Sequence, residues 1–323
     1  MAAFPIPASD RYRQTVVPVL GGELAVGNWR PAPGLPESGL AGADRAVLAV
    51  HGITGNHLCW PYLVDALADA SVVAPDLRGR GGSCNVPGPY GLAVHADDMV
   101  RVLDHAGIQQ AVVVGHSMGA FIALLLADRH PDRVSSLVLV DGGLPITERV
   151  PRNPRAAART VATSISARLE LEFSNLAAGV FFWRSHPAFE RDFSPVVQEY
   201  AEYDLGPWND GVRSRTRPSA IEQDSLEVMA GMAHRDALKS LSHPTQWLTA
   251  SRGLLDEPPG MYPPSLLMHW RECYPGIELR PVHHVNHYTI VLSRRGGDAI
   301  GQAVRRALEG QVRPPHGSQP SSV

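Results

Sequence analysis

Residues 111–127 read Ala-Val-Val-Val-Gly-His-Ser-Met-Gly-Ala-Phe-Ile-Ala-Leu-Leu-Leu-Ala, and this stretch constrains the fold more than any other. A run of β-branched residues ends at Gly115, and an apolar, helix-forming run follows Gly119. The pattern predicts a buried strand, a sharp turn with Ser117 at its apex, and a helix. Glycines two residues on either side leave room for a strained backbone at the serine. Ser117 is therefore expected to project its hydroxyl above the sheet edge and to attack a carbonyl.

Short apolar strands alternate with helical segments around this motif. Strands are predicted at 46–50, 71–74, 111–114, 136–140, 244–250 and 277–282, after an opening hairpin at 15–29. Helical spacing of apolar residues predicts helices at 61–70, 91–106, 118–129 and about 296–308. Short buried strands that alternate with helices are typical of an α/β fold, with a mostly parallel central sheet covered by helices on both faces.

The alternation stops between residues 145 and 242, where no apolar strand pattern occurs. Helices are predicted there at 155–180, 195–203 and 218–232. Insertions at the carboxyl ends of strands in open α/β sheets lie over the ligand site. We therefore interpret 145–242 as a helical cap, inserted after the sixth strand between two core segments, 1–144 and 243–309. Residues 310–323 are rich in Pro, Gly and Ser, and a disordered tail is expected there.

Composition excludes several classes of partner. The net charge of −3 and the scattered basic residues give no reason to expect nucleic acid or an anionic membrane. Cys59, Cys84 and Cys273 show neither a disulfide framework nor metal-ligand spacing, which favours a reducing compartment. No signal peptide and no apolar run of membrane-spanning length is evident. We expect a cytoplasmic protein with a small-molecule substrate and no metal. The sequence does not determine the oligomeric state, and a homodimer is one possibility.

Taken together, these features resemble the α/β-hydrolase fold superfamily, and specifically its capped serine hydrolases, over about residues 15–308. The motif Gly115-His116-Ser117-Met118-Gly119 matches the nucleophile elbow of that superfamily. Dehalogenase and epoxide hydrolase chemistry is disfavoured, because those relatives carry Asp where this chain has Ser117. The resemblance implies a catalytic triad in the order Ser, Asp, His, an oxyanion hole and no cofactor.

The resemblance places the catalytic base in the loop between the last strand and the last helix. His287, in Val285-Asn286-His287-Tyr288-Thr289, is the residue we expect there. His283 and His284 are its alternatives, since both lie closer to the end of the preceding strand. A histidine in this loop would take the proton of Ser117 as the hydroxyl attacks.

The resemblance also suggests the acid that orients the base. Asp256 follows the strand at 244–250 and precedes His287 by 31 residues, close to the common arrangement of the family. Asp141, at the end of the strand at 136–140, is the alternative, because some members place the acid there. Glu257 is a weaker alternative. We expect Asp256 to be the acid.

Two loops of the core are further matches to the family. His51-Gly52-Ile53-Thr54-Gly55 resembles the His-Gly loop, and the resemblance implies that the amides of Ile53 and Met118 form the oxyanion hole. The loop from Asp76 to Ser83 also resembles a family loop. For that loop we prefer a structural interpretation, in which Arg78 has a packing or ion-pair role rather than a contact with the substrate.

Aromatic residues give a hint about the substrate. Most of those in the insertion are expected to fill its own core, while Trp60, Phe182, Trp183 and Tyr288 are candidates for the wall of an apolar pocket. We predict a serine hydrolase that cleaves an ester, thioester or lactone of a small, largely hydrophobic substrate through an acyl-enzyme on Ser117. Hydrolysis of a carbon–carbon bond in a vinylogous diketone is an alternative, and a non-catalytic small-molecule receptor on the same fold is another.

Overall fold

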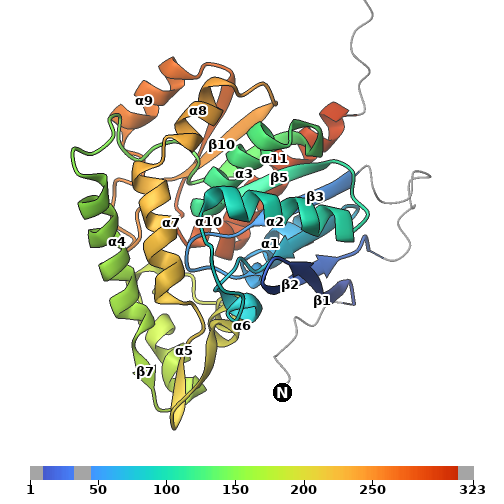
Figure 1. The fold of residues 1–323 in the computed structure, drawn as a ribbon. Coiled ribbons are helices and arrows are strands. Elements are labelled where there is room, and N and C mark those ends of the chain that lie inside the picture. The colour runs from blue at the N-terminus through green and yellow to red at the C-terminus, as the bar shows by residue number, and fades with distance from the viewer. Residues whose placement is uncertain (1–9, 33–44, 312–323) are drawn as a thin grey trace, which may run out of the picture.

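The computed structural model describes residues 10–32 and 45–311, and its centre is an eight-stranded sheet (Figure 1). Across the sheet the strand order is β1-β2-β4-β3-β5-β6-β10-β11. The strands are β1 (Tyr12–Val19), β2 (Gly22–Trp29), β3 (Ala46–Val50), β4 (Ser71–Pro75), β5 (Ala111–His116), β6 (Val134–Val140), β10 (Thr245–Ala250) and β11 (Ile277–Val282). Strand β2 runs antiparallel to its two neighbours, and the other pairs are parallel. The predicted mostly parallel sheet is confirmed.

Helices cover both faces of this sheet. They are α1 (Pro61–Ala66), α2 (Leu92–His105), α3 (Met118–Arg129), α8 (Ala233–Lys239), α9 (Pro264–Cys273), α10 (Thr289–Leu292) and α11 (Arg294–Gln311). Alternate residues of β5 enter two different cores: Val113 packs with α2, α3, α8 and α9, whereas Val112 and Val114 pack with α1 and α11. This alternation follows from the period of two along a strand and gives the sheet two buried faces.

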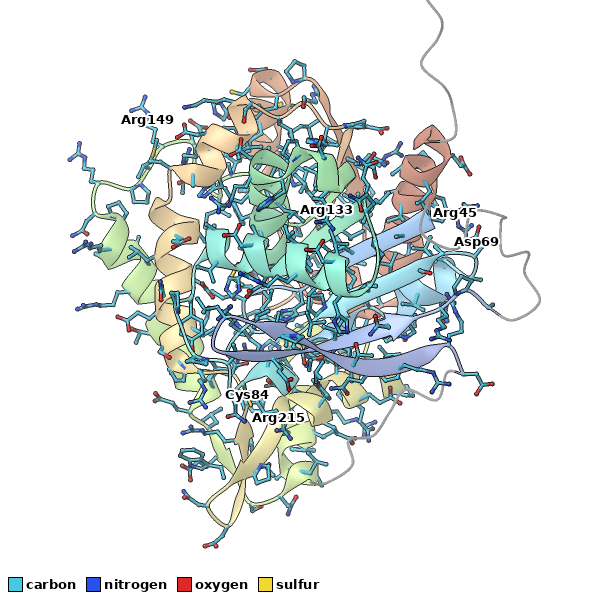
Figure 2. The ribbon with its side chains drawn as sticks, turned by 45° about the vertical axis from the view of Figure 1, so that its right-hand side comes forward. Arg45, Asp69, Cys84, Arg133, Arg149 and Arg215 are labelled. Carbon is cyan, nitrogen blue, oxygen red and sulfur yellow. The ribbon has the colours of Figure 1, made fainter. Side chains whose placement is uncertain are left out.

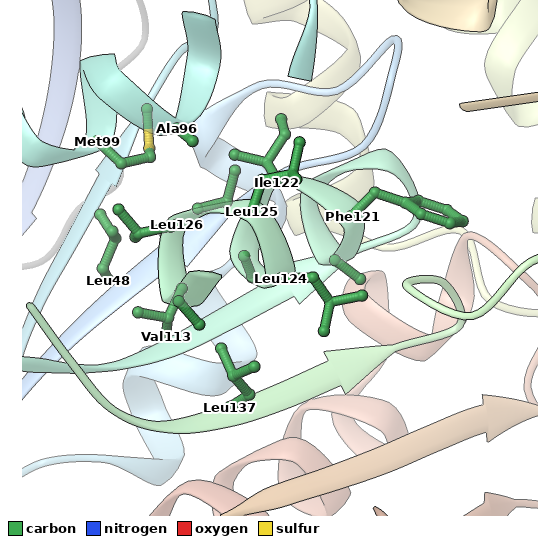
Figure 3. Close-up of a cluster of buried hydrophobic side chains, with 14 of the residues drawn as sticks. Leu48, Ala96, Met99, Val113, Phe121, Ile122, Leu124, Leu125, Leu126 and Leu137 are labelled. Carbon is green, nitrogen blue, oxygen red and sulfur yellow. The ribbon is translucent and has the colours of Figure 1, made fainter. Parts of the chain in front are cut away.

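Helix α3 packs on one face of the sheet beside α2, as Figure 3 shows. Its Leu124 and Leu126 are fully buried, and around it lie Val113 and Leu137 of the sheet and Met99 of α2. Each such side chain contributes about 1.5–3 kcal/mol when it leaves water. The helix that begins immediately after Ser117 is therefore fixed on several sides, and the turn that carries the serine is held with it.

The segment between β6 and β10 holds four further helices: α4 (Pro154–Leu169), α5 (Leu176–Arg184), α6 (Pro195–Asp204) and α7 (Pro218–Ala230). It also holds an antiparallel sheet in the order β7 (Glu172–Phe173), β9 (Gly211–Ser214), β8 (Leu205–Trp208), which the expectation of a purely helical segment missed. These strands have two to four residues and no apolar run, so the sequence gives little signal for them. Helix α8, by contrast, packs against α3 of the core.

Buried polar contacts fasten this segment to the loops of the core. Asp224 of α7 forms an ion pair with Arg80 at 2.6 Å and accepts a hydrogen bond from the Gly91 amide at 2.7 Å. On α6, the hydroxyl of Tyr203 donates to Asp76 at 2.7 Å. Arg217 donates to the Cys84 carbonyl, and Figure 2 shows Cys84 and Arg215 near this junction. The loop from Asp76 to Ser83 therefore anchors the inserted segment.

Within that loop, Arg78 pairs with the buried Asp98, so the expected ion pair is present. Helix α11 extends through Gly310 and Gln311, so the first two residues of the expected 310–323 tail are helical. The rest of that tail lies outside the described residues, as do 1–9 and 33–44 of the expected first core segment. No described helix combines the length and the apolar character that crossing a membrane requires.

Candidate active site

Ser117 occupies the sharp turn between β5 and α3, with φ 54° and ψ −119°. This left-handed φ is strained for a serine and is held by tight packing of the backbone around it. A Cβ at Gly115 would lie 2.3 Å from the Gly119 carbonyl oxygen, and one at Gly119 would lie 2.1 Å from the Val50 carbonyl oxygen. The Ser117 amide donates to the Val140 carbonyl at 2.9 Å. Both glycines are therefore required where strand, turn and helix meet.

A continuous line of contacts joins Ser117 to a carboxylate. Nε2 of His287 lies 3.0 Å from Oγ of Ser117, and Nδ1 of His287 lies 2.7 Å from Oδ2 of Asp141. Because an ionised carboxylate only accepts hydrogen bonds, Nδ1 carries the imidazole proton and Nε2 is free to accept the proton of Ser117. This is the geometry of a nucleophile, a base and an orienting acid.

The structure positions Asp141 firmly at the carboxyl end of β6. Its other carboxylate oxygen accepts a hydrogen bond from the Ala250 amide at 3.0 Å, and its own amide donates to the Leu248 carbonyl at 2.7 Å. The side chain is almost completely buried. Strands β6 and β10 are neighbours in the sheet, so backbone groups at the end of β10 hold the carboxylate of Asp141 at the end of β6.

The expectation that Asp256 contacts His287 is wrong in this structure. Asp256 lies in a turn beyond β10 with φ 68°, where its Oδ1 lies 2.8 Å from Arg252 and accepts a hydrogen bond from Asn286 at 2.9 Å. Its carboxylate is therefore engaged by the loop around it. Asp141, the alternative acid, is the residue against His287. The alternative bases His283 and His284 are exposed.

Two histidines beside Ser117, His287 and Asp141 help to position these residues, which the sequence did not predict. His116 donates from Nε2 to the His287 carbonyl at 2.9 Å, and His51 accepts the Leu77 amide at 2.9 Å. Burial, followed by the nearby His287, lowers the pKa of His116 well below its usual value. Burial lowers the pKa of His51 to about 4. Both rings are neutral at pH 7 and act as fixed hydrogen-bonding parts of the loops. The place of His116 in the motif, directly before Ser117, is the sequence feature that could have indicated its role.

Ile53 and Met118, whose amides are the expected donors of the oxyanion hole, line the same cavity as Ser117. Met118 is the first residue of α3, a position whose amide has no acceptor within the helix. Arg80 donates to the Ile53 carbonyl at 2.9 Å, which fixes the peptide group that follows the Ile53 amide. Gly52 lets the loop approach, since a Cβ there would lie 3.1 Å from Cβ of Ser117.

Ser117 opens into a cavity of about 500 Å³ between the core and the inserted helices α4 and α7. Its walls are mainly apolar; those contributed by the insertion include Val161, Ile165, Val228 and Met229. The polar groups in the wall include Thr54, Arg168, His186 and Ser225. The hydroxyl of Ser225 is buried and has no hydrogen-bond partner among the described residues. A cavity of this size and lining is typical of a small-molecule site.

Of the four aromatic residues expected in the pocket wall, only Tyr288 lines the cavity. Trp60 is fully buried at the start of α1 on the opposite side of the sheet from α3. Phe182 packs against Phe173 with ring centroids 5.6 Å apart, and Trp183 lies behind Tyr288 at 6.1 Å. Phe182 and Trp183 therefore pack against other aromatic side chains, whereas Phe181 of the same helix is exposed. Within residues 10–32 and 45–311, no group of three His, Cys, Asp or Glu side chains could hold a metal ion.

Comparison with known proteins gives a consistent family pattern. The sequence profile of the alpha/beta hydrolase fold matches residues 45–265. A protein of Caulobacter segnis named "Putative carbamate hydrolase RutD" is 42% identical over 101 residues, which cover 30% of this chain and 38% of that protein. Lipase LipV of Mycobacterium tuberculosis is 38% identical over 95 residues, 29% of this chain and 36% of the lipase. The matches thus span little more than a third of the curated relatives.

Two solved structures share the fold over nearly the whole chain. E-2-(acetamidomethylene)succinate hydrolase superimposes with a TM-score of 0.72 at 19% identity, covering 92% of this chain and 99% of that one. The M. tuberculosis esterase Rv0045c gives a TM-score of 0.68 at 20% identity, covering 93% of each chain. At this level of identity the similarity concerns the fold alone.

Proposed function

Because the chain belongs to the alpha/beta hydrolase fold family, whose profile covers residues 45–265, we propose that it is a serine hydrolase. The proposed substrate is an ester, thioester or lactone of a small, largely hydrophobic molecule. The observation that carries the proposal is the line of contacts from Ser117 through His287 to Asp141, which begins at a serine facing the cavity. Fold membership by itself does not specify this chemistry, so the proposal depends on the site.

In the proposed reaction, Nε2 of His287 removes the proton of Ser117 while Oγ forms a bond to the carbonyl carbon of the substrate. The amides of Ile53 and Met118 donate hydrogen bonds to the oxyanion that develops. His287 then gives the proton to the leaving oxygen or sulfur, the bond to the leaving group breaks, and an acyl-enzyme on Ser117 remains. Asp141 holds the ring in the required tautomer and stabilises the imidazolium that forms.

The second half of the reaction uses the same groups. His287 removes a proton from a water molecule, whose oxygen attacks the acyl carbon. The same amides stabilise the second oxyanion, and the proton returns to Oγ as the acid leaves. The apolar cavity suits this step because a low dielectric strengthens the contacts between the oxyanion and the two amides.

The decisive experiment measures hydrolysis of p-nitrophenyl esters and thioesters of increasing chain length by wild-type protein and Ser117→Ala. We expect turnover by the wild type, no turnover above background by the variant, and labelling of Ser117 alone by a fluorophosphonate probe. Turnover that survives Ser117→Ala would overturn the mechanism. Tight binding of esters with an unreactive Ser117 would favour the receptor alternative.

A further inference from the structure

Arg168 is the single arginine or lysine in the wall of the cavity that Ser117 faces, within the part of the chain that the structure describes. It lies near the end of α4, on the inserted segment. We propose that its guanidinium binds a carboxylate carried by the substrate, so that the enzyme acts on a monoanionic acid rather than on neutral molecules. The inference rests on the proposed function and specifies its substrate class.

The guanidinium is positioned over the two loops that flank the nucleophile. Its Nη2 donates to Oγ1 of Thr54 at 3.1 Å, and its Nη1 lies 3.4 Å from the hydroxyl of Tyr288. Thr54 follows Ile53 of the oxyanion loop, and Tyr288 follows the base His287. The guanidinium carbon also lies 4.9 Å from the ring centre of Trp183, on which it stacks. These contacts with the protein hold Arg168 in place, and the guanidinium keeps further N–H donors that take no part in them.

The charge of Arg168 has no partner of opposite sign at close range. Arg78 and Arg80 are each paired with a buried carboxylate, Asp98 and Asp224. For Arg168, no carboxylate within residues 10–32 and 45–311 lies at ion-pair distance. A guanidinium in an apolar cavity strongly favours an anion that completes its hydrogen bonds.

The other titratable groups that the structure describes near Arg168 do not form an ion pair with its guanidinium. Burial, followed by the charge of Arg168, lowers the pKa of His186, so this neighbour is neutral at pH 7. Burial raises the pKa of Asp204, and its Oδ1 accepts a hydrogen bond from the Thr216 hydroxyl at 3.3 Å. Glu257 is exposed and accepts a hydrogen bond from the Leu255 amide at 2.7 Å. Among the described residues, none of these groups forms an ion pair with Arg168.

A carboxylate suits the site better than a phosphate. One guanidinium balances one negative charge, and a planar carboxylate accepts two parallel N–H donors from the planar fork. A phosphate monoester would bring a second charge into a mainly apolar cavity with no second cation in its described wall.

The test uses two pairs of esters, in each of which one member carries a free carboxylate and the other its neutral methyl ester. On the acyl side these are p-nitrophenyl hydrogen glutarate and p-nitrophenyl methyl glutarate. On the leaving-group side they are 4-(butyryloxy)benzoate and its methyl ester. We expect wild-type protein to prefer the acid in at least one pair by about 10- to 100-fold in kcat/KM, the range for hydrogen bonds to charged groups. Arg168→Met should abolish the preference by slowing the acid far more than its methyl ester, and Arg168→Lys should retain part of it.

Arg159→Met is the matched control, because Arg159 lies on the same helix and is exposed outside the cavity wall. It should keep the full preference. The rate with the neutral ester and the melting temperature report whether each Arg168 variant is folded. No preference for the acid in either pair, or a preference that Arg168→Met keeps, would overturn the inference.

Calorimetric binding of the same four esters to Ser117→Ala separates this inference from the proposed function. Tighter binding of an acid than of its methyl ester, lost when Arg168→Met is added, supports the anion site even if wild-type protein hydrolyses nothing. Ser117-dependent hydrolysis with equal binding of acid and methyl ester would leave the hydrolase standing and remove the anion site.

Discussion

The carboxylate of Asp141 lies 2.7 Å from Nδ1 of His287, although 146 positions of sequence separate the two residues. Asp141 follows the last residue of β6, and His287 lies in the loop beyond β11. The parallel order β6-β10-β11 brings these carboxyl ends to one edge of the sheet. The pair is therefore a product of the sheet topology, and the Ser117 turn at the end of β5 lies at the same edge.

This pair predicts that Asp141→Asn will lower kcat by about 10⁴-fold, because an amide permits the wrong tautomer of His287. Asp256→Asn should lower it less than about tenfold, since Asp256 acts on Arg252 and Asn286 rather than on the base. Steady-state kinetics on a p-nitrophenyl ester will measure both. A larger loss for Asp256→Asn than for Asp141→Asn would contradict the assignment.

The sequence predicts the elbow and the base loop well, because both depend on local patterns. A β-branched run, two glycines and an apolar helix leave one conformation for Ser117, and α3 begins at Met118 as expected. His287 follows from its place between the last strand and the last helix. The acid is harder to predict, since β6 and β10 end side by side and each is followed by an aspartate. The choice between Asp141 and Asp256 depends on the loop backbone, which sequence patterns do not specify.

The pocket wall is also beyond sequence reasoning, for a different reason. Aromatic side chains suit either a ligand pocket or a core, and only the rotation of each helix decides between them. In α5, Phe182 and Trp183 pack among Phe173, Phe189 and Tyr288. Smaller residues of α4 and α7 form the wall instead. The role proposed for Arg168 rests on its three contacts, none of which a local sequence pattern indicates.

The tight packing around Gly119, in the turn that carries Ser117, predicts that Gly119→Ala will impair both folding and activity. A Cβ there would lie 2.1 Å from the Val50 carbonyl oxygen, which is backbone and cannot move aside. We expect a loss of about 1–3 kcal/mol in stability and of most esterase activity, because strand β3 and helix α3 must separate. Urea unfolding and kinetics will measure the effect. Gly276→Ala is the control, since nothing lies within 4 Å of its Cβ; equal stability of the two variants would contradict the prediction.

The buried ion pair between Asp224 and Arg80 predicts that Asp224→Ala will destabilise the fold by about 3–5 kcal/mol, the range for stranding a buried charge. Burial alone would raise the pKa of Asp224, but Arg80 and His95 outweigh it and hold the pKa below the usual value. Asp236→Ala removes an exposed pair with Lys239 and should cost less than about 1 kcal/mol. Urea unfolding will compare them, and similar losses would show that the Arg80 pair does not fasten the insertion.

Buried His234 predicts part of the acid sensitivity of the protein. Its ring packs edge-on against Phe121, both nitrogens lack hydrogen-bond partners among the described residues, and burial lowers its pKa to about 4. An unfolded histidine titrates near pH 6.5, so as the pH falls from about 6.5 to 4 the unfolded chain gains a proton that the native chain does not. Acidification in this window therefore favours unfolding.

Replacing the ring should flatten this dependence. The wild type loses unfolding free energy between pH 7.5 and pH 5, and we expect this loss to be about 2 kcal/mol smaller in His234→Leu. The reason is that the unfolded variant has no histidine at this position to take up a proton. Urea unfolding at several pH values will measure the slope. His283→Leu is the control, because that histidine is exposed and its replacement should leave the slope unchanged. A His234→Leu profile parallel to the wild type would show that the ring is not held neutral in the native state.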